Sequence, residues 1–452
     1  MQRNDAGHTP MSISPSFSWP PSLWAATAPA GPALPALEGD QLADVVIIGA
    51  GFTGLSAAIH LRQMGVGATI LEAAEPGWGA SGRNNGQVIP TLSGHDPSAM
   101  LKRHGEAGER FNALLRDSAA YLFDVVRKYD IQAEAEQTGW VQPVHSPGRL
   151  KLAEKRVKEW SALGAPVELL DRSAVAQMLG SSAWFGGFWN RTGGHINPLA
   201  LTRGLAGVAS GLGSAIYAHS PAVSMAYGNG RWTVKTTNGS VTARALVLAT
   251  NAYTGEFATR LAPDIAREVI PVLSWQMATK PISDNIAKTV IPGRQAVSDT
   301  HRELYFARWD ARNRLVTGGA ATFPGPAGAS LRKPVAERLQ RLWPQLGDVT
   351  FDFVWSGYVG MTPDSLLHSE VPGFPRIHQL GANGFAWVGC NGRGVALSIS
   401  LGRELARATQ NESIDKLGLP LSAPSPRPFQ QIVRRLAPFA LPLYRRLDAK
   451  EI

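Results

Sequence analysis

The pattern Gly-Ala-Gly-Phe-Thr-Gly at residues 49–54 constrains this chain more than any other feature, because it stands between a strand-like run and a helix-like run. Residues 45–48 are Val-Val-Ile-Ile, and a short β-branched run of this kind is typical of a buried parallel strand. Apolar residues recur at helical spacing from 55 to 64, and residues 68–71 form a second buried run. We therefore predict a strand, a tight glycine turn, a helix and a second strand.

Each of the three glycines has its own physical role in such a unit. Gly49 permits the tight turn, Gly51 lets the backbone approach a pyrophosphate without a Cβ in the way, and Gly54 lets the helix pack close to the strand. The first turn of the helix presents free N–H groups and a partial positive charge to phosphate. Glu72 ends the second strand, where its carboxylate can accept hydrogen bonds from ribose hydroxyls. These features predict a dinucleotide-binding unit, and a glycine-rich turn that binds nothing is the alternative.

The segment after this unit separates the two common dinucleotides. Residues 77–87 read Gly-Trp-Gly-Ala-Ser-Gly-Arg-Asn-Asn-Gly-Gln. A nicotinamide enzyme has no reason to place a polar, glycine-rich loop directly after the acidic strand, whereas a flavin enzyme must wrap the pyrophosphate and pass along the isoalloxazine ring. Within the loop, Arg83 can pair with phosphate and Asn84 can offer its amide. The loop therefore favours FAD over NAD, with an ordinary surface loop as the alternative.

The composition excludes several classes of protein. Hydrophobic residues make up 44% and charged residues 17% of the 452 residues, which argues against general disorder and allows two or three domains. The net charge of +9 comes without zinc-finger spacing or a basic run interleaved with aromatics, so we expect no nucleic-acid partner. The single cysteine, Cys390, excludes a disulfide framework and a cysteine-built metal site, and no cluster has the spacing of metal ligands. With no secretory signal and no apolar run long enough to span a membrane, we expect a cytoplasmic protein.

Two strand–helix zones lie far apart in the sequence and are separated by segments in which polar and apolar residues alternate. This order predicts an α/β fold with an α+β insert: a Rossmann-like FAD-binding domain and a discontinuous antiparallel-sheet substrate domain. The expected division is an irregular N-terminal arm at 1–40, the FAD-binding domain at 41–134, 195–256 and 366–412, the substrate domain at 135–194 and 257–365, and a basic C-terminal tail at 413–452. The tail mixes apolar residues with arginines, so it predicts either a helix docked on its own domain or a peripheral contact with an anionic membrane.

These motifs resemble the glycine/D-amino-acid oxidase (DAO) family of FAD-dependent flavoproteins. Within it they are most like the γ-glutamylputrescine oxidase branch, whose members carry a loop similar to Gly-Trp-Gly-Ala-Ser-Gly-Arg-Asn-Gly-Gly-Gln. The resemblance runs from about residue 19 to 410. Its further segments are Trp19 and Trp24 in the arm, His195–Pro198, Leu248–Thr254, Pro363–Asp364 and Gly389–Val395.

The resemblance implies a reaction and a cofactor. A member of the family oxidises the C–N bond of a small amine or amino acid by hydride transfer to N5 of FAD, and water hydrolyses the resulting imine. The electrons then pass to oxygen, to a quinone or to another carrier. Oxidation of a hydroxy acid and flavin binding without independent catalysis are the alternatives. The implied cofactor-binding residues are Gly49, Gly51, Phe52, Thr53, Gly54, Glu72, Ala73, Trp78, Gly79, Ala80, Ser81, Arg83, Asn84, Asn85, Gly86, Gln87, Val223, Thr250, Asn251, Gly392, Arg393, Gly394 and Val395.

The chain departs from the family pattern in two glycine-rich loops. The family segment Gly-Tyr-Ser-Gly-His-Gly has Cys390, Asn391 and Arg393 in place of Tyr, Ser and His, and Asn85 replaces the second glycine of Asn-Gly-Gly. We interpret Cys390 as a small buried residue.

Two absences bear on the chemistry that the resemblance implies. Some relatives attach FAD through a cysteine just before a Thr-Pro-Asp segment, and residues 355–364 contain no cysteine, which predicts non-covalent FAD. Some oxidases keep a lysine near the flavin to activate oxygen, and none occurs at 312–323 or 389–396. An oxidase and a dehydrogenase therefore both stay open.

Arg393, Tyr305 and Tyr358 are the predicted catalytic residues. Arg393 directly precedes the last predicted helix, where it can add positive charge near flavin N1 and the C2 carbonyl, which become negative on reduction. Tyr305 and Tyr358, together with Asp299 and Trp355, are expected to line a substrate pocket. An arginine that closes a surface loop and aromatic residues that fill a core are the alternatives. No general base is evident, and oxidation of a neutral amine needs none.

Overall fold

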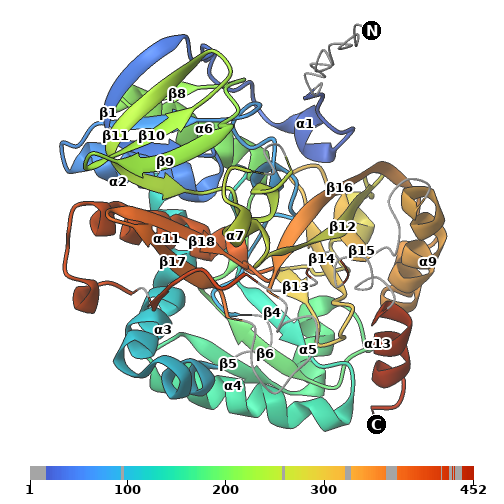
Figure 1. The fold of residues 1–452 in the computed structure, drawn as a ribbon. Helices are drawn as coiled ribbons and strands as arrows, with labels where there is room; N and C mark the ends of the chain where they lie inside the picture. The colour runs from blue at the N-terminus through green and yellow to red at the C-terminus, as the bar shows by residue number, and fades with distance from the viewer. Residues whose placement is uncertain are drawn as a thin grey trace, which may run out of the picture.

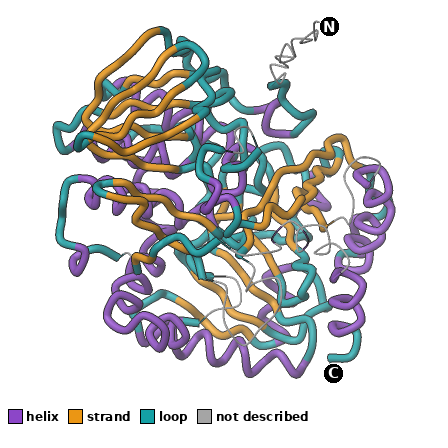
Figure 2. The backbone as a smooth tube through the Cα atoms, viewed as in Figure 1, coloured by secondary structure: helices purple, strands orange, loops and turns teal. Residues whose placement is uncertain are grey.

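The computed structural model describes residues 17–92, 96–256, 260–320, 327–362, 374–418, 420–426, 430, 432 and 440–451. Within these residues the chain forms two large sheets with helices packed outside them (Figure 1). Figure 2 shows the strands of the two sheets converging toward the middle of the molecule, while helices follow its lower and right-hand edges.

The first sheet contains nine described strands and has a mainly parallel centre. Its order is β19-β17-β18-β11-β1-β2-β8, and β10 and β9 extend from β11 as antiparallel strands. Strand β1 is parallel to both β11 and β2, so their carboxyl ends meet at one edge of the sheet. The strands are β1 (Gly39–Ile48), β2 (Ala68–Leu71), β8 (Ala215–Tyr217), β9 (Ser224–Gly228), β10 (Arg231–Lys235), β11 (Gly239–Leu248), β17 (Arg376–Gly381), β18 (Gly384–Val388) and β19 (Leu421–Ser422).

Three helices pack against the first sheet, a fourth, α3, packs on one of them, α11, and all four share one apolar core with the sheet. They are α2 (Phe52–Gln63), α3 (Pro97–Lys128), α6 (Pro198–Gly211) and α11 (Gly394–Thr409). Helix α2 is buried at every residue from Phe52 to Leu61, because α6 and α11 both pack on it. The β-branched run predicted as a buried strand, residues 45–48, forms the buried half of β1.

The second sheet contains eight described strands in the order β16-β12-β15-β14-β13-β4-β6-β5. Neighbouring strands are antiparallel except for the parallel pair β13 and β4. The strands are β4 (Trp140–Pro143), β5 (Val167–Leu170), β6 (Gly187–Asn190), β12 (Ile270–Thr279), β13 (Ala296–Ser298), β14 (Phe306–Trp309), β15 (Leu315–Ala320) and β16 (Phe351–Met361).

Helices also flank the second sheet, with α4 along the bottom of Figure 1 and α9 and α13 on its right. The helices are α1 (Leu23–Thr27), α4 (Leu150–Ala162), α5 (Arg172–Leu179), α7 (Pro263–Ala266), α8 (Asp284–Ala287), α9 (Ala327–Leu342) and α13 (Ala440–Asp448), and β3 (Gln87–Val88) pairs with β7 (Gly194–His195).

The predicted fold class, a Rossmann-like domain with an antiparallel-sheet second domain, is confirmed. The exact domain boundaries stay predictions. Every strand of the second sheet falls within 135–194 or 257–365, whereas the first sheet takes strands from the remaining segments. Strand β1 begins at Gly39, inside the expected arm, and β19 falls in the expected tail.

The N-terminal arm is less irregular than predicted. Residues 23–27 form helix α1, because the Ser22 hydroxyl caps it by accepting the Ala25 N–H at 3.0 Å. Trp24 is fully buried and its indole N–H donates to the Asn84 carbonyl at 2.8 Å. Trp24 therefore pins the arm to the glycine-rich loop.

The described end of the tail is docked on the second domain. Asp448 accepts hydrogen bonds from the backbone N and Nη1 of Arg302 at 2.9 and 2.5 Å, and Glu451 accepts two from Arg149 at 2.6 Å each. These contacts favour the docked interpretation for residues 440–451, while most of the stretch from 427 to 439 lies outside the described residues. None of the described helices combines the length and the apolar character needed to cross a membrane.

Candidate functional site

The three glycines after β1 leave no room for side chains. Gly49 has φ of +105°, a conformation that L side chains rarely adopt, and a Cβ on Gly54 would lie 2.0 Å from the Gly49 carbonyl oxygen. A Cβ on Gly51 would lie 2.8 Å from Oγ of Ser81. The turn has the geometry that a dinucleotide-binding unit needs, since Gly54 lets α2 approach β1 and Gly51 lets Ser81 of the following loop approach the turn.

Glu72 ties the end of β2 to this turn. One carboxylate oxygen accepts the Ala50 N–H at 2.7 Å and the other accepts the Ala74 N–H at 3.0 Å. Burial raises the pKa of Glu72, and the hydrogen bonds from Ala74 and Ala50 oppose that rise. Each carboxylate oxygen can accept a second hydrogen bond, so Glu72 can brace the turn and still bind a ligand hydroxyl.

The glycine-rich loop after β2 folds back over the start of α2. Oγ of Ser81 accepts the Phe52 N–H at 3.0 Å. The Asn84 side chain donates to the carbonyls of Ala80 and Ser81 at 3.1 and 3.0 Å and accepts the Gly86 N–H at 2.8 Å. Asn84 therefore uses its amide to hold the loop in shape.

Arg83 leaves this loop toward the second sheet. Its Nε donates to the Trp78 carbonyl at 2.6 Å, and its guanidinium carbon lies 4.2 Å from the centre of the Trp78 ring. Nη1 lies 3.5 Å from the Ser356 carbonyl of β16. Burial lowers the pKa of Arg83, and the phenols of Tyr253 and Tyr358 partly offset this. The pairing of Arg83 with a phosphate stays a prediction.

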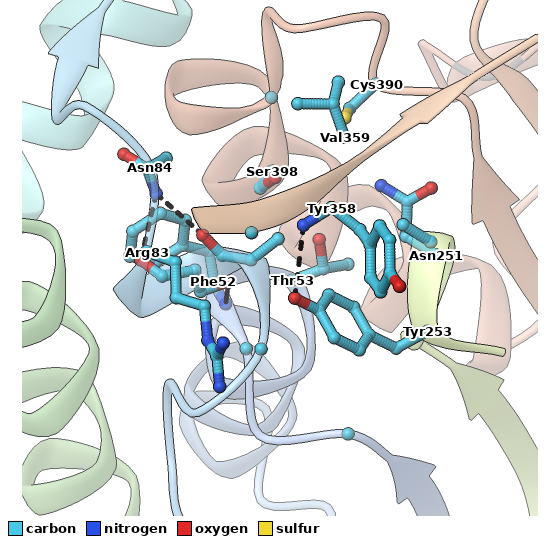
Figure 3. Close-up of a pocket in the computed structure, with 18 of the residues that line it drawn as sticks. Phe52, Thr53, Arg83, Asn84, Asn251, Tyr253, Tyr358, Val359, Cys390 and Ser398 are labelled. Carbon is cyan, nitrogen blue, oxygen red and sulfur yellow. Dashed lines mark hydrogen bonds between the residues drawn. The ribbon is translucent and has the colours of Figure 1, made fainter. Parts of the chain in front are cut away.

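A deep cavity runs from the glycine turn to the second sheet and encloses about 1890 Å³ of empty space, part of it open to solvent. We call the part lined by Gly49, Gly51 and Glu72 the nucleotide end, and the part lined by the second sheet the substrate end. Figure 3 shows Tyr253 and Tyr358 beside each other in this cavity, with ring centres 5.6 Å apart and the Tyr358 N–H donating to the Tyr253 hydroxyl at 3.3 Å.

Most of the predicted site residues share this cavity. Of the predicted catalytic residues, Arg393 and Tyr358 line it. The predicted cofactor-binding residues that line it are Gly49, Gly51, Phe52, Thr53, Glu72, Ala73, Trp78, Gly79, Ala80, Ser81, Arg83, Asn84, Asn85, Gln87, Thr250, Asn251, Gly392, Arg393, Gly394 and Val395.

Three predicted cofactor-binding residues lie outside the cavity lining. Gly54 packs α2 on the turn, as described above. Gly86 has φ of +79°, and a Cβ there would lie 2.1 Å from the Ile196 carbonyl oxygen. The absence of a side chain at Gly86 therefore lets the backbone of the loop pass close to the backbone at Ile196. Val223 is 39% exposed, and its neighbours Pro221 and Ala222 line the cavity instead.

Tyr305, Asp299 and Trp355 also lie outside the described lining, and each supports the wall from behind. The Tyr305 ring stacks on His301 with centres 4.1 Å apart. Asp299 is buried and its carboxylate contacts Nδ1 of His301 at 2.6 Å. Trp355 is buried and its indole N–H donates to the Arg83 carbonyl at 2.8 Å. Contact of these three side chains with a substrate, as expected from the sequence, stays a prediction.

Several lining residues were missed by the sequence reasoning. Tyr253 follows Asn251 in a short 3-10 helix, and Trp387 stands three positions before Cys390, so both lay next to motifs already recognised. Gln276 on β12 and Ser298 on β13 also line the cavity. They carry no motif, because only the pairing of distant strands brings them to the site.

Gln87 presents an unsatisfied acceptor in the cavity wall. Its Nε2 donates to the carbonyls of Val297 and Ala307 at 2.9 and 3.4 Å, which fixes the orientation of the amide. Its Oε1 is buried and has no hydrogen-bond partner among the described residues. A buried acceptor without a donor is costly, and a ring N–H such as that of an isoalloxazine would satisfy it. This acceptor and the turn that a Cβ would fill both fit FAD.

Helix α11 begins beside the cavity, directly after Arg393. The Arg393 side chain is 5% exposed, Nη1 donates to Oγ of Ser298 at 3.3 Å, and the guanidinium carbon lies 4.9 Å from the Trp140 ring centre. Burial, and secondarily repulsion from Arg156, lower the pKa of Arg393 to about 9. The guanidinium therefore lies against the second sheet, and its predicted action on the flavin stays a prediction.

Cys390 differs from the small buried residue expected. It is half-buried and lines the cavity, with Sγ 3.6 Å from the Gly360 carbonyl oxygen. The loop that carries it passes through left-handed backbone at Asn391 and Gly392, with φ of +48° and +78°. This turn brings Cys390 to the cavity border.

Known proteins are similar to this chain in sequence and in fold. The sequence pattern of the family described as FAD dependent oxidoreductase (DAO) matches residues 44–408. The chain is 34% identical to the probable oxidoreductase OrdL of Haemophilus influenzae, over 83% of this chain and 84% of that protein. It is 29% identical to gamma-glutamylputrescine oxidoreductase of Escherichia coli, over 82% of this chain and 84% of that protein. In fold it is similar to glycine oxidase from Geobacillus kaustophilus, with a TM-score of 0.68 at 20% identity over 82% of this chain and 96% of that chain.

The family match covers most of the chain, from the start of the glycine-turn unit to the end of α11. The cavity, its glycine turn and its unsatisfied acceptor are suited to the cofactor of that family. The chain therefore belongs to the DAO family of FAD-dependent oxidoreductases.

Proposed function

We propose that this FAD-dependent oxidoreductase oxidises the C–N bond of a small amine or amino acid and holds its FAD non-covalently. The observation that carries the proposal is the two-ended cavity, in which a dinucleotide-type turn faces a wall of side chains from the second sheet. The names of two relatives, gamma-glutamylputrescine oxidoreductase and glycine oxidase, support an amine or amino acid as the substrate class.

The nucleotide end would hold the pyrophosphate at the start of α2 and the ribose at Glu72. The loop at 77–87 and the start of α11 would border the isoalloxazine ring, and Gln87 would accept one of its N–H groups. Non-covalent attachment is supported by the absence of cysteine from 355–364. Release of intact FAD on denaturation would confirm it.

When bound, FAD accepts the hydride that leaves the carbon beside the amine nitrogen, and water hydrolyses the imine product. The task of the chain is to bind, orient and balance charge. The start of α11 lines the cavity, so its free N–H groups and the positive end of its dipole can stabilise negative charge there. Tyr253 and Tyr358 hold each other through a ring contact and a hydrogen bond, which gives the substrate end a fixed wall.

The described lining of the cavity offers no evident general base. It contains no histidine or lysine, and its carboxylate, Glu72, already accepts hydrogen bonds from the turn. We propose that the substrate amine enters neutral or loses its proton to water before the oxidation.

The test is to follow the flavin absorption band of the purified protein without oxygen while adding polyamines, γ-glutamyl amines, N-methyl amino acids and D-amino acids in turn. Bleaching by one of these classes supports the proposal, and rapid recovery in air distinguishes an oxidase from a dehydrogenase that uses a quinone or another carrier. A parallel titration adds hydroxy acids, and bleaching by a hydroxy acid with none by the amines, or no bleaching at all, would contradict amine oxidation.

A further inference from the structure

The loop between β13 and β14, residues 299–305, forms part of the wall at the substrate end. Leu304 in this loop lines the cavity, as does Phe306 at the start of β14. The backbone of Leu304 has φ of +56°, which a residue with a large side chain rarely adopts. A conformation of this kind persists only where the surrounding structure holds it in place. The contacts around the loop therefore decide whether Leu304 stays in the wall.

Two sets of contacts hold this loop, and the first comes from inside the second domain. Asp299 is buried, and its Oδ1 accepts the backbone N–H groups of His301 and Tyr305 at 3.1 Å each. The centre of the Tyr305 ring lies 4.1 Å from the imidazole centre of His301 and 4.4 Å from the guanidinium carbon of Arg338. These contacts anchor the two ends of the loop and leave its middle to other contacts.

The second set comes from the C-terminal segment, residues 440–451, which comprises α13 and the three residues after it. The backbone N–H and Nη1 of Arg302 donate to Asp448 at 2.9 and 2.5 Å, and Nη2 donates to Glu451. The three hydrogen bonds that Arg302 donates among the described residues all go to this segment. Asp448 is buried and lies 146 positions after Arg302 in the sequence. The C-terminal segment thus holds the loop two residues before Leu304.

The two carboxylates of this segment could instead suit a metal ion, because His145 lies beside them. Ligand atoms of His145, Asp448 and Glu451 all lie within 4.8 Å of one another. Arg302 contacts both carboxylates, however, and Glu451 also accepts two hydrogen bonds from Arg149 at 2.6 Å each. Two guanidinium groups already balance the charge of the two carboxylates and would repel a metal cation. The arrangement therefore favours a role in holding the loop over a metal site.

We propose that the docked C-terminal segment holds Leu304 in the cavity wall and thereby limits the size of the amine that the enzyme accepts. Arg302, Asp448 and Glu451 are then positioning residues, because they act through that side chain and are not among the described residues that line the cavity. The inference rests on the proposed amine oxidation and deepens it. When the hydrogen bonds to Arg302 are lost, the loop can relax from its left-handed backbone at Leu304. A wider substrate end would bind small amines less tightly and admit larger ones.

The first test needs no substrate and uses Cys390, the single cysteine, which lines the same cavity. The rate at which N-phenylmaleimide labels Cys390 in the FAD-loaded protein measures how open the cavity is. We expect Arg302→Met to raise this rate about fivefold or more, because the loop opens more often. Arg302→Lys should restore part of the wild-type rate, since a lysine keeps a charge-assisted hydrogen bond, and Asp448→Asn, which keeps the side-chain size, should give a smaller rise. A labelling rate in Arg302→Met at or below that of the wild type would overturn the proposal.

Two control variants separate an opened wall from a general loss of stability. Arg116 also donates to a carboxylate, that of Asp117 at 2.6 and 2.7 Å, but it lies on α3 and outside the described cavity lining. Arg116→Met should therefore leave the labelling rate unchanged. Leu304→Ala should raise the rate by itself, and Arg302→Met should then add little, because both changes remove the same part of the wall. An equal effect of Arg302→Met with and without the Leu304 side chain would show that Arg302 acts on the fold as a whole, against the proposal.

The second test compares the amine that reduces the flavin with the same amine carrying an N-benzyl group. We expect Arg302→Met to raise the KM of the smaller amine about tenfold with little change in kcat, because binding is weakened while the reacting atoms keep their places. The N-benzyl amine should gain in kcat/KM relative to the smaller one. Equal changes for the two amines, or a fall in kcat alone, would overturn the proposal. If no amine reduces the flavin, amine oxidation fails, while the labelling of Cys390 still decides whether the C-terminal segment controls the wall.

Discussion

The nucleotide end of the cavity is shaped by closely packed backbone, whereas the substrate end is shaped by side chains. The nucleotide end comes from one continuous stretch, residues 45–72, and its shape depends on side chains being absent at the glycine turn. The substrate end gathers side chains from β12, β13, β14, β16 and the loop before α11. The first end should therefore be sensitive to added volume, and the second to changed charge and hydrogen bonding.

The largest effect should follow from adding volume at the nucleotide end with Gly54→Val. The new Cβ would lie 2.0 Å from the Gly49 carbonyl oxygen, so α2 must move away from β1. We expect a loss of stability of about 4 kcal/mol or more and loss of bound FAD. The flavin content per chain and urea unfolding measure the two effects.

Gly207→Ala is the matched control, because Gly207 is exposed on α6 and an added Cβ would meet nothing within 4 Å. It should keep full flavin and gain about 0.5 kcal/mol, since alanine reduces the freedom of the unfolded chain. A Gly54→Val protein with full flavin and normal stability would refute the claim that close backbone packing shapes this end.

The next prediction compares the stability effects of replacing two buried arginines. Arg393 lines the substrate end of the cavity, and Arg308 is not among the described lining residues. Arg308→Met leaves three backbone carbonyls without their donor, so we expect stability to fall by about 3 kcal/mol. Arg393→Met removes a buried charge with only neutral contacts, so stability should stay the same or rise. Urea unfolding of both variants tests this contrast, and a similar loss in both would show that Arg393 is also structural.

The smallest effect concerns the loop at 299–305, which carries Leu304 of the cavity wall and is held by the C-terminal segment. Hydrogen bonds from Arg149 and Arg302 lower the pKa of Glu451 from 4.5 to about 2. A lowered pKa means that the carboxylate stabilises the fold above pH 4.5, and that this contribution is lost as the pH falls from 4.5 toward 2.

We therefore expect Glu451→Gln to lose about 1 kcal/mol at neutral pH, a modest value because the pair is partly exposed. The difference from the wild type should shrink as the pH is lowered below 4.5. Glu106→Gln is the control, because its side chain is 91% exposed and it should change stability little at any pH. A difference between Glu451→Gln and the wild type that does not vary with pH would show that the lowered pKa plays no part.

The amino-acid sequence by itself determined the nucleotide end. One short segment contains the glycine turn, its flanking strands and the acidic residue after the second strand. These features occur at a fixed spacing because their contacts are local, so the sequence alone predicts them. The same holds for the start of α11 at Gly394, which the glycine-rich segment at 389–395 predicted.

The tertiary structure alone decided the substrate end. Tyr305 and Tyr358 look alike as aromatic residues in predicted strands, yet Tyr358 lines the cavity while Tyr305 stacks on His301 behind the wall. Gln276 and Ser298 reach the cavity because β12 and β13 lie in one sheet, and Arg393 reaches Ser298 across 95 positions of sequence. The pairing of distant strands decides which side of each strand faces the ligand, and no local spacing in the sequence records that pairing.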